Sequence, residues 1–490
     1  MGDQTPAAGR YTLTTNAELG GARLRLHDVH GTHGLGGLYE LVARVSTSLP
    51  EGLDDDAIDA LLGGCVRVGP AGATDGQRWG VVRHVQMLPM HRPRGADAWV
   101  TAYALELVPK LWRLRLTRRS HAYAAGTHLE IVKAILAEHG LTEGRFVEDR
   151  CEETYPSREM TVQYDETDYD FVLRLCQYNG IHLHFAQGEG TETLVLGDRN
   201  GAFDALPEHD ALTYSALEVP PTDEAPVVWG LRRSRRPRSR AVVVRDYNWR
   251  APQQPVRALH AADERSGLGW VDLYGEHVAD EADARRLARV RAEELLVEHD
   301  VIEAKTALRS VQPGSWFELT AHPNPELNRR YLVIHADERL ADGGHSYVNA
   351  FRAIPFEAPF RPARTVPWPR VEGLTNAIVD GESRSTATPL DAQGRYRVVL
   401  PYDDGAQPGG RASRWVRRAQ PSAGEGYGTH FPLHIGAEVA LAHVNGDPDR
   451  PIIVGAVPNA ATPTPVSATN ATHSRIRSAS GVTIEMDDDC

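Results

Sequence analysis

The sequence has little of what marks several common protein classes. Its four cysteines stand far apart, with no C-x-x-C pair: Cys65, Cys151, Cys176 and Cys490. We therefore expect neither structural zinc nor a disulfide framework, and reduced thiols are the default. No apolar run approaches the roughly 20 residues that cross a bilayer, so we expect no stable membrane insertion. Residues 1–10 lack the basic and apolar segments of a secretory signal, so any export would use another route.

Lysine is nearly absent: Lys110, Lys133 and Lys305 are the only three, and arginine carries almost all of the positive charge. None of the three follows a glycine, which excludes a standard phosphate-binding P-loop. The formal net charge is -13, whereas a nucleic-acid groove needs a basic surface, so we expect no nucleic-acid partner. The arginine-rich segment Arg232–Arg240 is a local exception, interrupted by Pro237, and we interpret it as a solvated loop.

Catalytic motifs are missing as well. There is no G-x-S-x-G elbow, H-E-x-x-H zinc helix or dinucleotide G-x-G-x-x-G. The acidic pairs Asp165–Glu166 and Asp487–Asp488 suit general acid–base chemistry in principle, but 66 carboxylates produce such pairs by chance. We interpret Asp165 to Asp170 as a helix start, where carboxylates favour the positive end of the helix dipole. We therefore expect no catalytic residue.

Histidines are the remaining candidates for a metal site. His182 and His184 lie two apart on an expected strand and project from one face, which is the geometry of a metal pair. Two further groups are His27, His30 and His33 in a Gly-rich loop, and His430, His434 and His443 in the C-terminal region. Metal sites need three or four converging ligands, and the spacing supplies no such set. We interpret the histidines as hydrogen-bonded structural residues and expect no metal or cofactor.

The sequence does contain many short strands punctuated by Gly, Pro, Asn and Asp, which indicates a mainly β fold. The length of 490 residues predicts three or four domains. Three helices are expected: one after the capping box Thr127–Glu130, one from Thr167 to Gly180 and one over about Glu281–Glu298. Each has a single apolar stripe, so we expect surface helices packed on β-structure.

Strands are expected at residues 23–26, 39–45, 99–108 and 181–185. Pro359, Pro362, Pro367 and Pro369 then predict a stiff linker rather than a core segment. The following region has strands at 395–401, 414–419, 438–444 and 451–457, with a tight turn at Asn445–Pro448. Short strands at this density suit a small closed barrel such as an OB-fold.

The C-terminal unit contains Gly394–Val398, Trp415–Pro421, Phe431–Val439 and the run Gly446, Asp447, Pro448, Asp449, Arg450 and Pro451. In these residues it resembles the spike-base OB domain of the valine-glycine repeat protein G (VgrG) family of type VI secretion. Pro109–Trp112, Tyr155–Glu159 and Gln163–Phe171 resemble the phage-tail-hub-like region of the same family. In all, the resemblance covers about Arg23 to Asp489.

The resemblance implies a domain order. Residues 1–365 would form a tail-hub-like body of two pseudo-equivalent barrels with helical insertions, divided at about residue 150. A Pro-rich linker at 366–370, an OB-fold spike-base domain at 371–459, and a linker with the start of a triple-stranded β-helix needle at 460–490 would follow. Family members usually continue into a long needle, and here only Ile476 to Met486 represents its beginning.

The resemblance also implies a function and partners. The protein would be a non-enzymatic homotrimer that caps a tube, punctures a target envelope and carries effectors. Its partners would be a hexameric tube protein of the haemolysin-coregulated type, baseplate components, a proline-alanine-alanine-arginine (PAAR) repeat tip protein and effectors. It would be cytoplasmic during assembly and then secreted by injection.

The tail supplies a physical reason for a trimer. Val482, Ile484 and Met486 alternate with polar residues, so one face of this strand is apolar. Such a strand is not stable alone, and three copies around an axis would bury it. We therefore predict Ile476, Val482, Ile484 and Met486 as trimer contacts.

Two alternatives stay open. The same architecture serves contractile phage tails and extracellular injection particles, and one sequence does not separate these from type VI secretion. A spike-associated cell-wall hydrolase is the alternative from another class, although no segment of lysozyme size is left unassigned.

Overall fold

The structure is a computed structural model, and it describes residues 11–49, 51–70, 76–90, 99–188, 190–207, 209–217, 225–341, 346–382 and 389–489. The chain forms two compact units. Unit 1 comprises Met1–Thr117, His128–Pro156 and Thr167–Pro367, and unit 2 comprises Arg118–Thr127, Ser157–Glu166 and Trp368–Cys490. The sequence-based division had assigned residues 118–127 and 157–166 to the body. The structure groups these two segments with the C-terminal region, because they pair with each other as strands β7 and β9 of unit 2.

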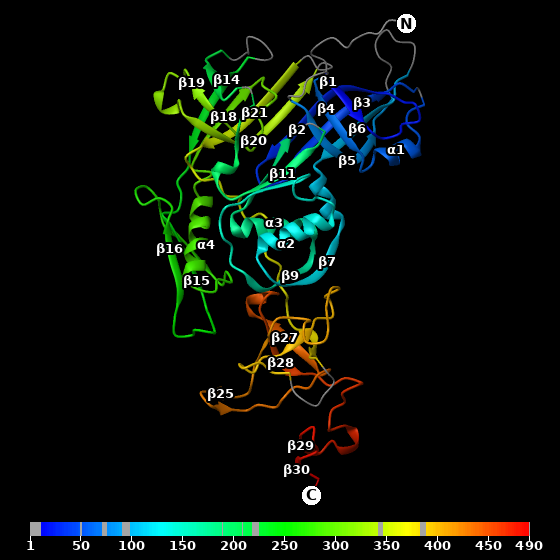
Figure 1. Ribbon diagram of the computed structural model, residues 1–490, viewed down its shortest axis with the longest axis vertical. Coiled ribbons are helices and arrows are strands. Elements are labelled where there is room, and N and C mark those ends of the chain that lie inside the picture. Colours follow the sequence, from blue (N-terminus) through cyan, green and yellow to red (C-terminus); the bar gives the residue numbers. More distant parts are fainter. Residues whose placement is uncertain are drawn as a thin grey trace. The chain divides into compact units, whose positions relative to one another are not determined.

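Unit 1 is built on a 13-stranded sheet whose first part curls around a hydrophobic core (Figure 1). Its strands, in order across the sheet, are β1 (Tyr11–Thr15), β4 (Cys65–Pro70), β5 (Arg78–Met87), β6 (Ala102–Val108), β3 (Glu40–Thr47) and β2 (Leu24–Gly34). Tyr103, Leu105 and Leu107 of β6 are almost completely buried and lie opposite Val45, Ala43 and Leu41 of β3. This confirms the strand predicted at 99–108, although it begins at Ala102 rather than Trp99.

The second part of the sheet closes into a ring. The order continues through β20 (Arg330–Ala341), β21 (Ser346–Pro355), β18 (Asp300–Thr306), β14 (Val227–Arg235), β13 (Ala211–Ser215), β19 (Ser315–Thr320) and the short edge strand β12 (Asp204–Ala205). An additional pairing of β19 with β20 joins the ends of the ring. Phe317 and Phe351 meet edge to face inside it, with ring centroids 5.6 Å apart. The mainly β, barrel-based fold class is confirmed, but the first part is an open curled sheet and the second is closed.

The helices are α1 (Asp55–Leu61), α2 (His128–Glu138), α3 (Asp168–Asn179) and α4 (Glu281–Glu294), with short 3-10 helices at Lys110–Leu116, Asn200–Ala202 and Pro325–Leu327. The predicted ends of α3 are confirmed. The Thr167 side chain accepts a hydrogen bond from the Asp170 amide, and Gly180 takes the left-handed conformation with φ 74°. However, nearly every residue of α3 is buried, so the prediction of a surface helix was wrong for α3.

Two helix predictions need correction. Helix α4 ends at Glu294 instead of Glu298, and the chain continues in turns. Helix α1 was not predicted, although its signals are local. The Asp54 side chain accepts a hydrogen bond from the Ala57 amide at 2.8 Å, and glycines follow the last turn. Among the described residues, no helix has the length and apolar character needed to cross a membrane.

Two smaller sheets complete unit 1. One has the order β10 (His182–Gln187), β11 (Glu192–Gly197) and β8 (Val147–Arg150). The other has the order β16 (Val256–Ala261), β15 (Ala241–Asp246) and β17 (Trp270–Tyr274). Helix α4 packs against β15 and β16 on one face of this second sheet (Figure 1).

The proline-rich segment before the unit boundary begins inside the core of unit 1. Phe360 and Arg361 are only 5% and 3% exposed. The Gln177 side chain, itself buried, accepts hydrogen bonds from the amides of Thr365 and Val366 at 2.9 and 3.2 Å. The prediction that this segment is a linker rather than a core segment was therefore wrong for its first half. The prolines do not prevent burial because side chains, rather than a backbone ladder, hold the segment.

Unit 2 contains a small closed barrel. Its sheet has the order β23 (Arg397–Val399), β22 (Thr375–Asp380), β27 (Glu438–His443), β28 (Pro451–Ala456) and β24 (Arg417–Arg418). Tyr396 and Val416 exchange two backbone hydrogen bonds of 2.9 and 2.7 Å, which closes the ring beside β23 and β24. Strand β22 was missed in the sequence. The strand predicted at 438–444 is confirmed as β27. Its Val439 and Leu441 lie in the barrel core, and the extra residue of the bulge opposite Ala440 and Leu441 is Val454 of β28.

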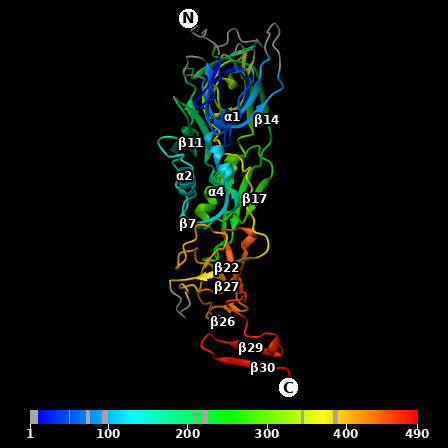
Figure 2. The ribbon, with the colours of Figure 1, turned by 90° about the vertical axis from the view of Figure 1, so that its right-hand side faces the viewer.

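The remaining elements of unit 2 lie outside this sheet. They are β7 (Arg118–Gly126), β9 (Arg158–Thr167), β25 (Ala423–Gly424), β26 (Tyr427–Gly428), the 3-10 helices Val444–Gly446 and Ala468–Asn470, and the hairpin β29 (His473–Arg477) and β30 (Thr483–Asp487). Figure 2 shows β29 and β30 side by side. The strand predicted over 476–486 is therefore a two-stranded hairpin.

Candidate functional site

The turn between β27 and β28 carries the predicted family motif. Its residues are Gly446, Asp447, Pro448, Asp449, Arg450 and Pro451. The Asp447 carboxylate accepts a hydrogen bond from the Asp449 amide at 2.9 Å and one from Arg450 Nε at 2.8 Å. Asp449 is 1% exposed, and its Oδ1 accepts a hydrogen bond from the Val162 amide of β9 at 2.6 Å. The motif thus fixes its own turn and attaches β9 to the barrel, which is a structural role.

Trp415, the other motif residue, lies at a cavity of about 630 Å³ inside unit 2. The Arg397 guanidinium stacks on the Trp415 ring at 4.7 Å from its centroid. Arg411 and Arg414 line the same cavity, and Arg414 forms an ion pair with Glu159 at 3.8 Å. Arginines beside an aromatic ring suit contact with acidic or planar groups.

His121 borders this cavity and was not singled out in the sequence. Its Nδ1 lies 3.1 Å from Asp403 and 2.9 Å from Asp404. Asp403 Oδ1 also accepts hydrogen bonds from the amides of Ala122 and Gly405. The hydrogen bond with Asp403 and the one with Asp404 raise the pKa of His121, against the effect of burial. The raised pKa favours the protonated ring between the two carboxylates. Asp404 lies 283 residues from His121 in the sequence, which hides the group from sequence inspection.

The C-terminal hairpin has two different faces. Ile476 lies directly opposite Ile484, and Ser474 lies opposite Met486. Ile476, Val482, Ile484 and Met486 are 51%, 70%, 63% and 65% exposed. The other face carries cross-strand ion pairs, in which Glu485 contacts Arg475 and also His473, the latter at 3.0 Å. The structure therefore places the four predicted contact residues together on one small, uncovered hairpin.

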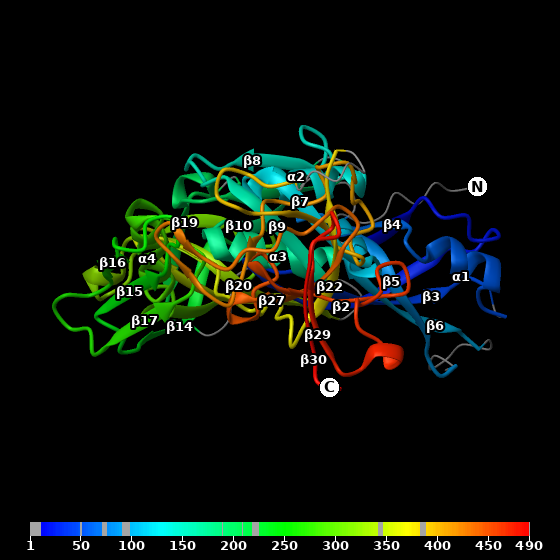
Figure 3. The same cartoon turned by 90° about the horizontal axis from the view of Figure 1, so that it is seen from below.

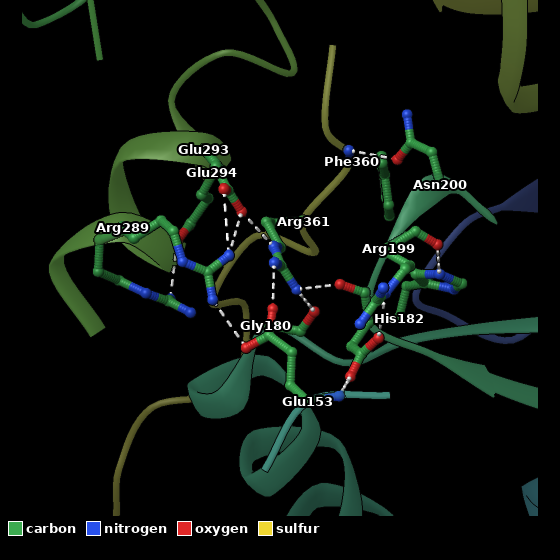
Figure 4. A network of polar contacts seen from close by, with 12 residues as sticks. Glu153, Gly180, His182, Arg199, Asn200, Arg289, Glu293, Glu294, Phe360 and Arg361 are labelled. Carbon is green, nitrogen blue, oxygen red and sulfur yellow. Dashed lines mark hydrogen bonds and ion pairs between the residues drawn. The ribbon is translucent and has the colours of Figure 1, made fainter. Parts of the chain in front are cut away.

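A buried polar network joins distant segments of unit 1 (Figure 4). Arg361 Nε donates to Glu293 of α4 at 2.6 Å, and Arg361 Nη2 donates to Glu153 at 2.9 Å. Its Nη1 donates to the carbonyl oxygens of Gly180 and Asp198. Burial alone would raise the pKa of Glu153, but hydrogen bonds from Arg289 and Arg361 lower it. The network fastens the end of unit 1 to α3 and α4.

The buried histidine pair does not form a metal centre in the described part of the chain. His182 stacks on Phe203, with ring centroids 4.1 Å apart. Burial lowers the pKa of His184 to about 3 and also lowers the pKa of His182, so both rings are neutral near pH 7. No third histidine, cysteine or carboxylate of the described residues converges on them. The groups His27, His30 and His33, and His430, His434 and His443, do not converge either within those residues.

The two acidic pairs lie in unlike settings. Asp165 is exposed, has φ 45° and accepts a hydrogen bond from Arg118 at 2.8 Å, whereas Glu166 is buried. Helix α3 begins three residues later at Asp168, so the interpretation as helix-start chemistry holds for Asp168 and Asp170 but not for Asp165 and Glu166. Asp487 and Asp488 are exposed at the end of the hairpin.

The two parts of the chain match two known families. Residues 36–344 match the family described as phage tail baseplate hub (GPD). Residues 387–457 match the type VI secretion system/phage-baseplate injector OB domain. The chain belongs to the phage tail baseplate hub family, and its resemblance to VgrG proteins is confirmed by its relatives.

Two of these relatives are spike proteins of Pseudomonas aeruginosa. The type VI secretion system spike protein VgrG1b is 28% identical over 96% of this chain and 63% of its own length. VgrG1c is also 28% identical, over 97% of this chain and 67% of its own length. The actin cross-linking toxin VgrG1 of Vibrio cholerae is 30% identical over 72% of this chain and 33% of its own length. The chain thus spans about two thirds of the length of these two spike proteins and about one third of the length of the toxin.

Solved structures share the fold. The E. coli c3393 protein, a component of the type VI secretion system with similarity to the T4 tail proteins gp27 and gp5, superposes with a TM-score of 0.67 at 22% identity. It covers 91% of this chain and 100% of its own. A chain of the Francisella PdpA–VgrG complex has a TM-score of 0.57 at 7% identity, over 95% of this chain and 72% of its own.

Proposed function

We propose that this protein is a trimeric, non-enzymatic hub and spike-base protein of a contractile injection system of the type VI secretion kind. One observation carries the proposal: a tail-hub region and an injector OB domain follow each other in a single chain. In this role the body caps the tube, the barrel begins the spike, and the hairpin starts the needle. The work done is mechanical, so no residue is assigned to catalysis and no cofactor or metal is required.

The hairpin supports the trimer on physical grounds. A lone two-stranded hairpin is at best marginally stable in water. Here it also exposes four large apolar side chains on one face. Burying one such side chain contributes about 1.5–3 kcal/mol. Three copies around an axis would remove all of these faces from water together.

The proposed function implies several binding partners. They are a hexameric tube protein of the haemolysin-coregulated type, baseplate components, a PAAR-repeat tip protein and effectors. Effector carriage is supported by a relative named for an actin cross-linking toxin and by a structural neighbour named as a PdpA–VgrG complex. The protein would assemble in the cytoplasm and be secreted by injection.

A phage tail or an extracellular injection particle is the second candidate. The matched families favour it, since one is described as phage tail baseplate hub and the other names type VI secretion and the phage baseplate together. Neighbouring genes separate the two: genes for a membrane-anchored complex mark type VI secretion, and their absence marks a particle.

The test is the mass of the full chain in solution, measured by analytical ultracentrifugation. We expect about three times the 53.8 kDa of one chain. Ile484→Asp puts a charge on the apolar face and should raise the concentration for half-dissociation more than tenfold, since each 1.4 kcal/mol is a factor of about ten. Thr483→Asp, on the opposite face of the same strand, is the matched control and should leave the trimer intact. A monodisperse wild-type monomer would overturn the proposal.

A further inference from the structure

The sheet of β16, β15 and β17 has one face that α4 does not cover. Its register places three rows of residues on that face. They are Trp270 with Ala241 and Ala261, Asp272 with Val243 and Leu259, and Tyr274 with Arg245 and Arg257. The opposite face, with Val242, Val244 and Ala258, is buried where α4 packs. Aromatic side chains therefore lie on the face of the sheet that points away from α4.

The uncovered face, which we call the outer face, exposes its large side chains, whereas Ala241 and Val243 of the central strand are buried. Trp270 is 73% exposed, Tyr274 62% and Leu259 54%. Large aromatic residues at this exposure, on the same face of one edge strand, are typical of binding surfaces. Trp and Tyr are also the residues that most often dominate the energy of an interface.

The charges of the outer face show which partner it suits. Arg245 and Arg257 lie directly opposite each other on β15 and β16, and both are exposed. Like charges in this position are destabilising. Asp272 compensates Arg245 with two hydrogen bonds of 2.9 Å. Among the described residues, Arg257 has no ion-pair partner. A partner with carboxylates beside an apolar patch would relieve this arrangement.

Such a surface exists elsewhere in unit 1. Helix α1 carries Asp55, Asp56 and Asp59, which are exposed and, in the part of the chain that the structure describes, have no ion-pair partner. Leu62, just after the helix, is 44% exposed, and Met87, at the end of β5, is 63% exposed.

These residues belong to one end of the unit. Met87 pairs with Tyr103, whose hydroxyl accepts a hydrogen bond from the Leu53 amide at 2.8 Å, so the end of β5 lies beside the start of α1. Aspartates and apolar side chains together form what we call the α1 end. It is complementary to the outer face in charge and similar to it in apolar character.

The outer face and the α1 end lie on opposite sides of unit 1, in Figure 1 and again in Figure 3. A cyclic trimer uses two different surfaces of each copy, because each copy offers one surface to the copy before it and another to the copy after it. We propose that the outer face of one copy docks on the α1 end of the next copy around the trimer. This inference rests on the proposed trimer and adds a second contact to that of the C-terminal hairpin.

A charge exchange tests the contact in the full chain. Arg257→Glu and Asp56→Arg each place like charges across the interface, and each should raise the concentration for half-dissociation of the trimer about tenfold. The double variant restores opposite charges and should recover most of the loss. Arg339→Glu changes an exposed arginine of β20 outside both surfaces and serves as the control. Recovery in the double variant is the result that a merely destabilised chain would not show.

Cross-linking tests the same contact by proximity. The variants Trp270→Cys and Met87→Cys are made in a chain with Cys65, Cys151 and Cys490 changed to Ser. A short bismaleimide should link the two variants when they are assembled together, and neither variant should link to itself. Covalent trimers are expected when one chain carries both cysteines.

The outcomes separate this inference from the proposed function. A wild-type trimer that forms no cross-link and ignores both charge reversals overturns the inference alone, since the hairpin then accounts for assembly. A wild-type monomer overturns both. A cross-link between unlike variants, with recovery in the charge-exchange double variant, supports the inference even if Ile484→Asp has little effect.

Discussion

The Arg361 network and the C-terminal hairpin place side chains in opposite kinds of unfavourable environment. Arg361 puts a full positive charge where it is only 3% exposed, yet it contacts Glu153, Glu293 and two backbone carbonyls of the same chain. The hairpin puts apolar side chains in water, and its own chain brings nothing to cover them in the described structure. A single chain therefore supplies all partners of Arg361 but leaves the apolar face of the hairpin exposed.

This difference distinguishes interactions that one folded chain must complete from contacts that a second copy can supply. A buried charge must be compensated in the folded chain itself, because an unpaired one costs several kcal/mol. Leaving an apolar side chain exposed to water costs less free energy per residue, so such a face can stay exposed until a second copy covers it. Unit 1 should thus be stable without the trimer, whereas the hairpin should depend on it. The predictions below test that division.

The largest expected effect comes from Arg361→Ala. It removes the buried cation between Glu153 and Glu293, whose side chains are 17% and 16% exposed and keep Arg289 as a partner. Removing one member of a buried pair costs about 3–5 kcal/mol. The loss should appear as a lower urea midpoint for the unfolding of unit 1. Arg364→Ala, which removes a half-exposed ion pair with Glu276 in the same segment, is the control and should cost less than about 1 kcal/mol. Equal losses in the two variants would show that the network does not hold the segment.

The second effect concerns acid. Glu338 is buried in unit 1, and burial alone would raise its pKa. Arg78 and a hydrogen bond of 2.8 Å with His33 instead lower the pKa to about 2. The folded state therefore releases this proton more readily than the unfolded chain, and the stabilisation is present above pH 4.5 and lost as pH falls towards 2.

The measurement is the difference in free energy of unfolding between the wild type and Glu338→Gln across this range. It should shrink by about 3 kcal/mol between pH 4.5 and 2, because each unit of pKa shift corresponds to about 1.4 kcal/mol. A difference that stays constant with pH would contradict the depressed pKa.

Features that depend on residues close together in the sequence were predicted, and features that depend on distant residues were missed. Both ends of α3 were predicted because Thr167 and Gly180 act within one helical turn. The strand that contains Tyr103, Leu105 and Leu107 was predicted because strand periodicity is local. The Arg361 network was missed because its partner Glu153 lies 208 residues away. The same holds for β7 and β9, which join unit 2 through pairing that no short window of sequence contains.

The candidate sites divide in the same way. The apolar face of the hairpin was predicted, since alternating residues share one side of a strand. The outer face was not, because opposed arginines such as Arg245 and Arg257 become visible only when the register of two strands is known. The Arg232–Arg240 segment was interpreted as a solvated loop, but part of it belongs to strand β14.

A smaller effect of opposite sign is expected from Glu192. Burial raises its pKa to about 7, although the Lys110 amide donates to it at 2.5 Å and Tyr39 also donates to it. The folded state holds a proton that the unfolded chain releases, so stability falls as pH rises from 4.5 towards 7. The stability advantage of the wild type over Glu192→Gln should fall by about 2 kcal/mol between pH 4.5 and 6. An advantage that grows over this range would show that the carboxyl is ionised in the fold.

The smallest effect is expected on the charged face of the hairpin. Arg475 lowers the pKa of Glu485 through a hydrogen bond, but Glu485 is exposed, where ion pairs contribute little. Glu485→Gln should therefore leave the thermal midpoint and the dissociation of the trimer unchanged, in contrast to Ile484→Asp on the other face. Loss of the trimer in Glu485→Gln would mean that the copies pack through the ion-paired face. The apolar face would then remain exposed in the assembly, and it would be the surface on which a needle or tip partner has to bind.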